Sequence, residues 1–342
     1  MSQEDDAPAQ GEAPSLPPAP APRHDSRRRL LRLAPLLPLG SLLWWALSRR
    51  PDPDAGKLRV TAIDVGQGDS TLIQTPAGRT ILVDGGGASD EVGADADDVG
   101  ARVVVPFLNY LGISRLDVLV LTHPHGDHVG GLAAVLRSVE VGTVLDGTLL
   151  PYPSPAYAKF LALVHGKAIP YARAVRGMTL DMGDGVTLSV LNPPPSPLFG
   201  TAAAFGTGTD DAAINNYSAS LLVRYGRTRF VLTGDAENEA EGAMLAAGGD
   251  LACDVLKAGH HGSKNATGDD WLSRLKPRQA VISCGRHNRF GHPAPSTLAR
   301  LDAANIETFR TDRQGAISFV SDGRTVTARP FLGPLPPSSR SA

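Results

Sequence analysis

The 342-residue sequence has few cysteines, no internal repeat and no unbroken apolar run of the length that a membrane-spanning helix needs. Its two cysteines, Cys253 and Cys284, could pair in an oxidising compartment, but two thiols do not establish that compartment. The longest apolar stretch, residues 30–47, has 18 residues and contains Arg32 and two prolines. A spanning helix needs about 20 apolar residues, so this stretch is short and broken.

Positive charge is also scarce in most of the chain. The first fifty residues hold seven Arg and five acidic residues, which leaves 26 basic and 30 acidic residues in residues 51–342. A formal charge of −4 is not typical of a protein that binds nucleic acid strongly. Any DNA contact would therefore depend on a local patch or on bound metal ions. The composition, 42% hydrophobic, is that of a soluble globular body, long enough for one large α/β domain and a tail.

The N-terminal region differs from this body. Residues 1–25 are rich in Pro and Ala and are predicted to be disordered. Residues 26–50 begin with Ser-Arg-Arg-Arg-Leu-Leu-Arg before the apolar stretch, which resembles a twin-arginine export signal. An uncleaved membrane anchor and an ordinary basic amphipathic helix are the alternatives. Either export interpretation predicts an extracytoplasmic body, residues 57–330, and the tail 331–342 is predicted to be disordered.

The sequence is rich in metal-binding side chains at one place, the segment LTHPHGDHVGG of residues 121–131. An apolar strand is predicted for residues 116–121 and a helix for residues 129–139, so the segment is a strand-to-helix loop. Four potential ligands lie within six residues: His123, His125, Asp127 and His128. Three imidazoles this close would repel one another if they were protonated. Their ring nitrogens and the carboxylate would cost free energy if they were buried without partners. A divalent ion such as zinc or manganese resolves both problems.

Two later strand ends carry further candidate ligands. Asp235 follows a predicted strand and a Gly, where it could be a plain turn residue or a metal ligand. The pair His260-His261 follows a strand predicted for residues 254–258. A His pair at the end of a strand is hard to explain structurally, so one of the two is expected to complete a second metal site. Alternation from Asp254 favours His260.

Two Gly-rich segments, residues 65–69 and 84–87, also follow predicted strands. Neither has the G-x-G-x-x-G or G-x-x-x-x-G-K spacing of a phosphate-binding loop, so both are predicted to be tight turns near the site. Asp84 is expected to accept hydrogen bonds from the backbone or from a metal-binding His, and Asp64 is assigned a similar supporting role.

Seven motifs together resemble the metallo-β-lactamase superfamily, and within it the extracytoplasmic hydrolase domain of the ComEC family of DNA-uptake competence proteins. In chain order they are DVGQGDS, THPHGDHVGG, NNYS, LTGD, LKAGHHGSKN, GRHNRFGHP and TDRQGAI, from about Leu58 to Val326. The resemblance implies a four-layer αββα sandwich with two metal sites at one edge of its sheets. Because this chain carries no multi-span membrane channel, a stand-alone exported relative is expected.

The resemblance also implies roles for individual residues. His123 and His125 would hold the first of two divalent ions, zinc or manganese. Asp127, His128 and His260 or His261 would hold the second, and Asp235 would bridge both. The antibiotic-hydrolysing branch has a further His before the bridging Asp, but none occurs between His165 and Asp235. Asn215 or Asn216 occupies that region, after a predicted long loop at residues 192–213, and an amide there favours manganese somewhat.

The predicted function is therefore that of an exported two-metal phosphodiesterase or nuclease acting on DNA, in which Asp127 and Asp235 serve catalysis as metal ligands. The side chains expected to contact the substrate are Asn215, Asn216, Ser263, Lys264, Arg286 and Arg289. His292 or His287 would protonate the leaving oxygen. A membrane DNA-uptake channel is the expected partner. The alternatives are a hydrolase of lactams, lactones, thioesters or phosphocholine esters, and a non-catalytic DNA-binding surface module.

Overall fold

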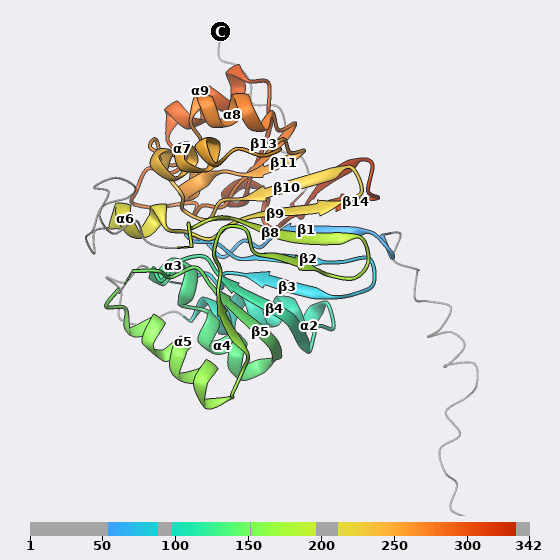
Figure 1. The fold of residues 1–342 in the computed structure, drawn as a ribbon, viewed down its shortest axis with the longest axis vertical. Coiled ribbons are helices and arrows are strands. Elements are labelled where there is room, and N and C mark those ends of the chain that lie inside the picture. The colour runs from blue at the N-terminus through green and yellow to red at the C-terminus, as the bar shows by residue number, and fades with distance from the viewer. Residues whose placement is uncertain (1–53, 88–97, 151, 196–210, 333–342) are drawn as a thin grey trace, which may run out of the picture. The chain divides into compact units, whose positions relative to one another are not determined.

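The computed structural model describes residues 54–87, 98–150, 152–195 and 211–332. Two β-sheets lie face to face in this part of the chain, and helices cover the outer side of each sheet (Figure 1). The predicted leader, the signal-like segment and residues 333–342 of the tail lie outside the described residues and stay predictions. None of the described helices is both long and apolar enough to cross a membrane.

The first sheet has eight strands among the described residues, in the order β15-β14-β1-β2-β3-β4-β5-β6. Their bounds are Leu58–Ala62 (β1), Thr71–Gln74 (β2), Thr80–Val83 (β3), Arg115–Leu121 (β4), Glu140–Asp146 (β5), Tyr171–Arg173 (β6), Ile317–Ser321 (β14) and Val326–Pro330 (β15). Strands β3 to β6 pair in parallel and the others antiparallel. Its outer side carries the π-helical turn η1 (Gly100–Val104) and the helices α2 (Val105–Tyr110), α4 (Leu132–Ser138) and α5 (Pro155–Gly166).

The second sheet has seven strands in the described part of the chain, in the order β13-β12-β11-β10-β9-β8-β7. Their bounds are Thr179–Asp181 (β7), Val186–Asn192 (β8), Ser220–Tyr225 (β9), Thr228–Leu232 (β10), Val255–Lys257 (β11), Gln279–Ile282 (β12) and Glu307–Arg310 (β13). Strands β10 to β13 pair in parallel. Helices α7 (Asn238–Ala247), α8 (Asp269–Leu275) and α9 (Pro295–Ala303) cover its outer side, and α10 (Thr311–Gln314) follows β13.

Alternating side chains produce the layers. In β3, Ile81 and Val83 point into the core between the two sheets, whereas Leu82 packs under the helices of the first sheet. In β10, Phe230 lies in the core between the sheets and Val231 packs under the helices of the second sheet. A strand that is apolar on both faces is typical of a sheet covered on both sides. The predicted four-layer αββα sandwich is confirmed.

Two predicted elements differ in detail. The helix predicted for residues 129–139 is two helices, α3 (Gly126–Val129) and α4, because the chain turns at Gly130-Gly131. The amide of Gly131 donates to the carbonyl of Gly86, 2.8 Å away, so this amide joins the helical segment to the turn after β3. The end of the predicted loop at residues 192–213 belongs to α6 (Asp211–Asn216), and residues 196–210 lie outside the described part.

The close approach at Gly131 predicts a large effect of one added methyl group. A Cβ there would lie 2.1 Å from the carbonyl oxygen of Gly85 and 2.8 Å from the amide nitrogen of Gly100. Backbone atoms cannot move aside as side chains do, so Gly131→Ala should lower the free energy of unfolding by about 3 kcal/mol. The control is Gly242→Ala in α7, where an added Cβ would meet no atom within 4 Å apart from its chain neighbours and the backbone of its own helix. That change should stabilise by about 1 kcal/mol. Urea unfolding of both variants measures the difference, and equal effects would contradict the packing described here.

Candidate active site

The site lies where loops after parallel strands of both sheets meet. The loop after β4 carries His123 and His125, and the short helix α3 that follows carries Asp127 and His128. Asp235 follows β10 in the second sheet. The His260-His261 pair follows β11, in the 3₁₀ turn η2 (Gly259–Gly262). Because the carboxyl ends of parallel strands from both sheets lie at this edge of the sandwich, residues more than a hundred positions apart come together here.

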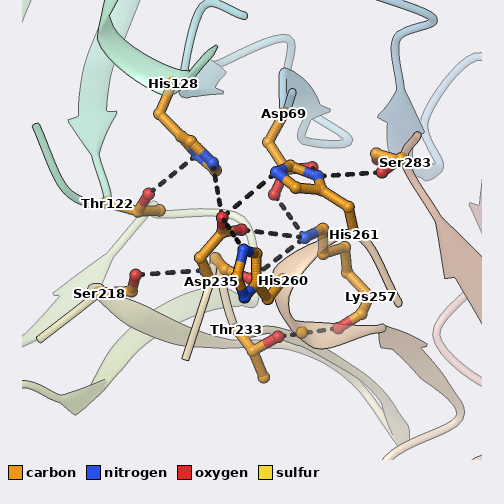
Figure 2. Close-up of polar contacts among 12 residues, drawn as sticks. Asp69, Thr122, His128, Ser218, Thr233, Asp235, Lys257, His260, His261 and Ser283 are labelled. Carbon is orange, nitrogen blue, oxygen red and sulfur yellow. Dashed lines mark hydrogen bonds and ion pairs between the residues drawn. The ribbon is translucent and has the colours of Figure 1, made fainter. Parts of the chain in front are cut away.

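Asp235 is the centre of this arrangement. Its Oδ2 lies 3.2 Å from Nε2 of both His128 and His261, 3.9 Å from Nε2 of His260 and 4.0 Å from Nε2 of His123. Figure 2 shows the carboxylate of Asp235 between His128, His260 and His261. The carboxylate is buried, at 2% exposure, so its charge cannot be balanced by solvent.

Several atoms of the site are suited to hold metal ions. Asp127, His128, Asp235 and His261 each offer a ligand atom within 4.8 Å of those of the other three. The buried atoms that form no hydrogen bond with the described residues include Nε2 of His125, Nε2 of His128, Nε2 of His261 and Oδ1 of Asp235. Buried polar atoms are nearly always satisfied in folded proteins. Nitrogen and carboxylate atoms left open at one point therefore fit a divalent transition metal.

A second group of residues orients the imidazoles. Oδ2 of Asp84 lies 2.8 Å from Nδ1 of His128, and the same carboxylate accepts from the amide and hydroxyl of Thr122. The contact leaves Nε2 of His128 facing Asp235. Nδ1 of His123 lies 3.0 Å from the Thr122 hydroxyl and 3.2 Å from the Ser218 hydroxyl. Fixing one ring nitrogen in this way sets the tautomer and direction of the other.

The His260-His261 turn is strained. Both residues have positive φ, 42° and 53°, a region that residues other than glycine rarely occupy. Because β11 ends at Lys257, the extended alternation used to favour His260 does not reach the pair, and that reasoning is wrong. The turn directs both rings toward Asp235, and His261 belongs to the four-residue group. Glu237 orients the ring of His260, because Oε1 of Glu237 lies 2.7 Å from Nδ1 of His260.

A buried ion pair adjoins the cluster. Nζ of Lys257, at the end of β11, lies 2.5 Å from Oδ2 of Asp69, which precedes β2 in the other sheet. The same ammonium donates to the carbonyl of Gly234 and lies 3.9 Å from Oδ1 of Asp235. Oδ1 of Asp69 lies 3.5 Å from Nδ1 of His261. One lysine thus links the two sheets and balances two carboxylates of the site (Figure 2).

The charges of the cluster depend on one another. Burial alone would raise the pKa of Asp235, but His128 and His261 hold the pKa well below its usual value. Burial opposes protonation of His128, yet the carboxylate of Asp235 raises the pKa of that imidazole well above its usual value. Burial lowers the pKa of His123 well below its usual value, and the adjacent His128 and His125 lower it further. The cluster is therefore held together electrostatically around Asp235.

A model of the metallo-β-lactamase superfamily matches residues 63–286, well over half of the chain. The chain belongs to the metallo-β-lactamase superfamily. ComE operon protein 3 of Bacillus subtilis (strain 168) is 33% identical over 278 residues, which cover 78% of this chain and 34% of that protein. Competence protein ComA of Neisseria gonorrhoeae is 32% identical over 294 residues, 83% of this chain and 36% of that protein. The chain thus spans about a third of the length of these relatives.

Among solved structures, the CmlA β-hydroxylase E377D mutant is similar with a TM-score of 0.46 and 14% identity, over 79% of this chain and 54% of that chain. The family match confirms the resemblance expected from the seven sequence motifs. It also identifies the fold as that of a metallo-hydrolase, with the His and Asp cluster as its candidate metal centre.

A cavity of about 410 Å³ opens above the candidate metal centre of this metallo-β-lactamase fold. Its lining residues are Gln67, His125, Asp127, Tyr152, Asp211, Asn215, Asp235, His260, His261, Arg289, Phe290 and His292. Three of them were predicted from the sequence: Asn215 and Arg289 as substrate contacts, and His292 as a proton donor to the leaving oxygen. Oδ1 of Asn215 and Nδ1 of His292 are buried and form no hydrogen bond with the described residues. Burial lowers the pKa of His292 to about 4, so its ring is neutral at neutral pH.

Other predicted substrate contacts do not line the cavity. Oδ1 of Asn216 accepts from the amides of Glu237 and Ala240 at the start of α7, so its side chain supports that helix. The hydroxyl of Ser263 accepts from the amide of Asn265, and Lys264 is exposed.

Three more predicted residues lie outside the lining of the cavity. The side chain of Arg286 donates to the carbonyl of Asp312. His287 lies in the same loop and is exposed. Oδ1 of Asp64 accepts from the amide of Gly66, within its own turn.

Sequence reasoning missed Asp69, Lys257 and Glu237. A sequence signal existed for Lys257, because a lysine inside the apolar run Val255–Ala258 of a buried strand requires a buried partner. Its partner could not be found from the sequence, since 188 positions separate the two residues and only the packing of the sheets brings them together. Asp69 is the last residue of the motif DVGQGD, and Glu237 lies two residues after LTGD, but neither motif shows which side chains face inward.

Proposed function

We propose that this protein is a metal-dependent phosphodiesterase that cleaves DNA. The observation that carries the proposal is the group of Asp127, His128, Asp235 and His261, whose ligand atoms meet below an open cavity. His123, His125 and His260 lie close enough to complete a second ion site around Asp235. Two divalent ions bound there, zinc or manganese, would supply a nucleophile at neutral pH and neutralise phosphoryl charge.

The residues of the chain have separate tasks in this proposal. Asp84 orients His128 through a contact with its Nδ1, and Glu237 orients His260 in the same way. Arg289 at the rim of the cavity binds a phosphate next to the one that is cleaved. The Nδ1 of His292 is buried and forms no hydrogen bond with the described residues, so an N–H at this position could donate a hydrogen bond to the leaving oxygen. The amide of Asn215 takes the place of an imidazole and contacts the substrate or an ion.

Two observations favour a phosphodiester over a lactam. The chain has no His between His165 and Asp235, so the imidazole used there by the antibiotic-hydrolysing branch is missing. Two of the curated relatives are described by their names as a competence protein and a recombination protein. We further propose that the domain works outside the cytoplasm, as the twin-arginine-like segment indicates, beside a membrane channel for DNA. Fractionation of cells that express the full chain tests this location, and a purely cytoplasmic enzyme would contradict it.

Parallel assays on one protein sample test the reaction. The full chain, stripped of metal by chelation, is given manganese, zinc or magnesium and then labelled DNA, bis-p-nitrophenyl phosphate or a chromogenic lactam. Cleavage of both phosphodiesters that returns only with metal is the expected result. Lactam turnover without phosphodiester turnover would place the chain in the other branch. No turnover of any substrate, together with DNA binding, would favour a binding module.

A further inference from the structure

The loop between β12 and α9 places an aromatic side chain at the rim of the cavity. Phe290 lines the cavity and remains 49% exposed. The other large hydrophobic residues that the described part of the chain exposes are Tyr110, Tyr171, Phe331 and Leu332, and none of them lines this cavity. About half of the phenyl ring is exposed to solvent beside a strongly polar site, so packing within the fold does not explain its position. A flat ligand that binds there would cover the ring.

The ring of Phe290 has charged and aromatic neighbours. The guanidinium carbon of Arg289 lies 5.1 Å from the centre of the ring, within the range of a cation–π contact. The ring of His292 lies 5.8 Å away and is nearly parallel, at 23°. A flat π-surface, a cation and an imidazole thus stand together beside the metal cluster. Such a combination is suited to bind a nucleotide through its base and its phosphate at the same time.

The loop is held in shape before any ligand binds. Oδ1 of Asn288 accepts from the amides of Phe290 and His292, and its Nδ2 donates to the carbonyls of Gly285 and His292. The amide of Gly285 donates to Oε1 of Gln67, which belongs to the turn after β1. Because these bonds fix the backbone on both sides of Phe290, stacking of a ligand on its ring requires little ordering of the loop.

The charge of the body limits which nucleic acid can bind. Residues 51–342 carry a formal charge of −4, which disfavours binding that depends mainly on broad electrostatic attraction to a duplex backbone. In a duplex, both faces of each base are already stacked, so an enzyme ring gains contact only with an unpaired or terminal base. Stacking on an aromatic ring supplies affinity without basic residues and without sequence preference.

We propose that Phe290 is a stacking platform for an unpaired base next to the phosphate being cleaved, so that the substrate is single-stranded or frayed nucleic acid. This inference rests on the proposed phosphodiesterase activity, which it deepens by naming the substrate class. Arg289 would bind the phosphate on the far side of the stacked base. The aromatic ring of Tyr152, 4.9 Å from the ring of His125, lines the same cavity and could contact the next base.

A scan with abasic oligonucleotides tests the platform. Single-stranded oligonucleotides, each lacking one base at a successive position, are cleaved by the full-length protein with its metal. Wild-type kcat/KM should fall about tenfold at one position beside the cut. Phe290→Ala should lose a similar factor on the intact strand and become insensitive to the missing base. Phe290→Trp should retain the wild-type pattern. The matched control is Tyr110→Ala, an exposed aromatic in α2 away from the cavity, which should behave as wild type.

A binding measurement separates this inference from the proposed reaction. A strand that contains 2-aminopurine should lose fluorescence on binding to the metal-stripped full chain of wild type and Phe290→Trp, but not of Phe290→Ala. If wild type cleaves no DNA with any metal, the proposed reaction fails and this quenching still decides the stacking. If kcat/KM were the same at every position of the missing base, the proposed stacking on Phe290 would be wrong. Equal quenching in Phe290→Ala would also overturn it.

Discussion

Replacing Asp235 by Ala should lower the rate of metal-dependent phosphodiester hydrolysis by about 10³-fold or more, because the bound metal ions would supply several kcal/mol of transition-state stabilisation. Asp235 is the residue that all four nearest imidazoles share, with Oδ2 within 4.0 Å of each. Without it, both proposed ion sites lose a carboxylate at once. Asp235→Asn keeps the shape of the side chain and removes its charge, so it should be nearly as inactive.

The measurement is kcat/KM on bis-p-nitrophenyl phosphate at saturating manganese or zinc. Asp302→Ala is the control, an exposed Asp in α9 that undergoes the same chemical change. It should keep wild-type activity and a free energy of unfolding within about 0.5 kcal/mol of wild type. If Asp235→Asn kept more than a tenth of the wild-type rate, Asp235 could not be the shared ligand.

Replacing Lys257 by Met should lower the free energy of unfolding by about 3–5 kcal/mol, the usual effect of removing one partner of a buried ion pair. Lys257 is 2% exposed, and burial opposes its charge. The carboxylates of Asp69 and Asp235 nevertheless raise its pKa. Methionine fills a similar volume, so the expected loss comes from charge and hydrogen bonding. The substitution leaves the buried carboxylate of Asp69 without its lysine partner.

The double variant Lys257→Met/Asp69→Asn is the matched control, because it removes both charges of the pair. It should be more stable than the sum of the two single changes predicts, with a coupling energy of about 1–3 kcal/mol. Urea unfolding of the metal-stripped proteins gives all four free energies. Strict additivity would show that the 2.5 Å contact contributes no net stability to the fold.

Short-range patterns predicted the parts of the site that lie on one strand and the loop after it. The strand before His123, the ligand loop and the position of Asp235 after β10 all follow from local hydrophobicity and turn residues. The helix after the ligand loop was predicted as one piece because propensity does not show that the amide of Gly131 bonds the carbonyl of Gly86. Steric contact with Gly85 and Gly100, in distant segments, fixes that break.

Features that depend on both sheets could not be predicted in the same way. The strained turn at His260-His261 breaks the alternation on which the preference for His260 rested. Asn216, which looked like a substrate contact, supports the first turn of α7 because α6 brings it there. The sequence motif NNYS does not distinguish Asn215, which faces the cavity, from Asn216, which does not.

The central claim is that the cluster around Asp235 is a metal centre, and anomalous diffraction tests it most directly. Crystals of the full chain soaked in manganese or zinc are measured at the absorption edge of the metal. We expect anomalous peaks within about 2.3 Å of Nε2 of His128, Nε2 of His261 and a carboxylate oxygen of Asp235. Crystals saturated with metal that show no peak at this cluster, or peaks only elsewhere on the chain, would contradict this claim.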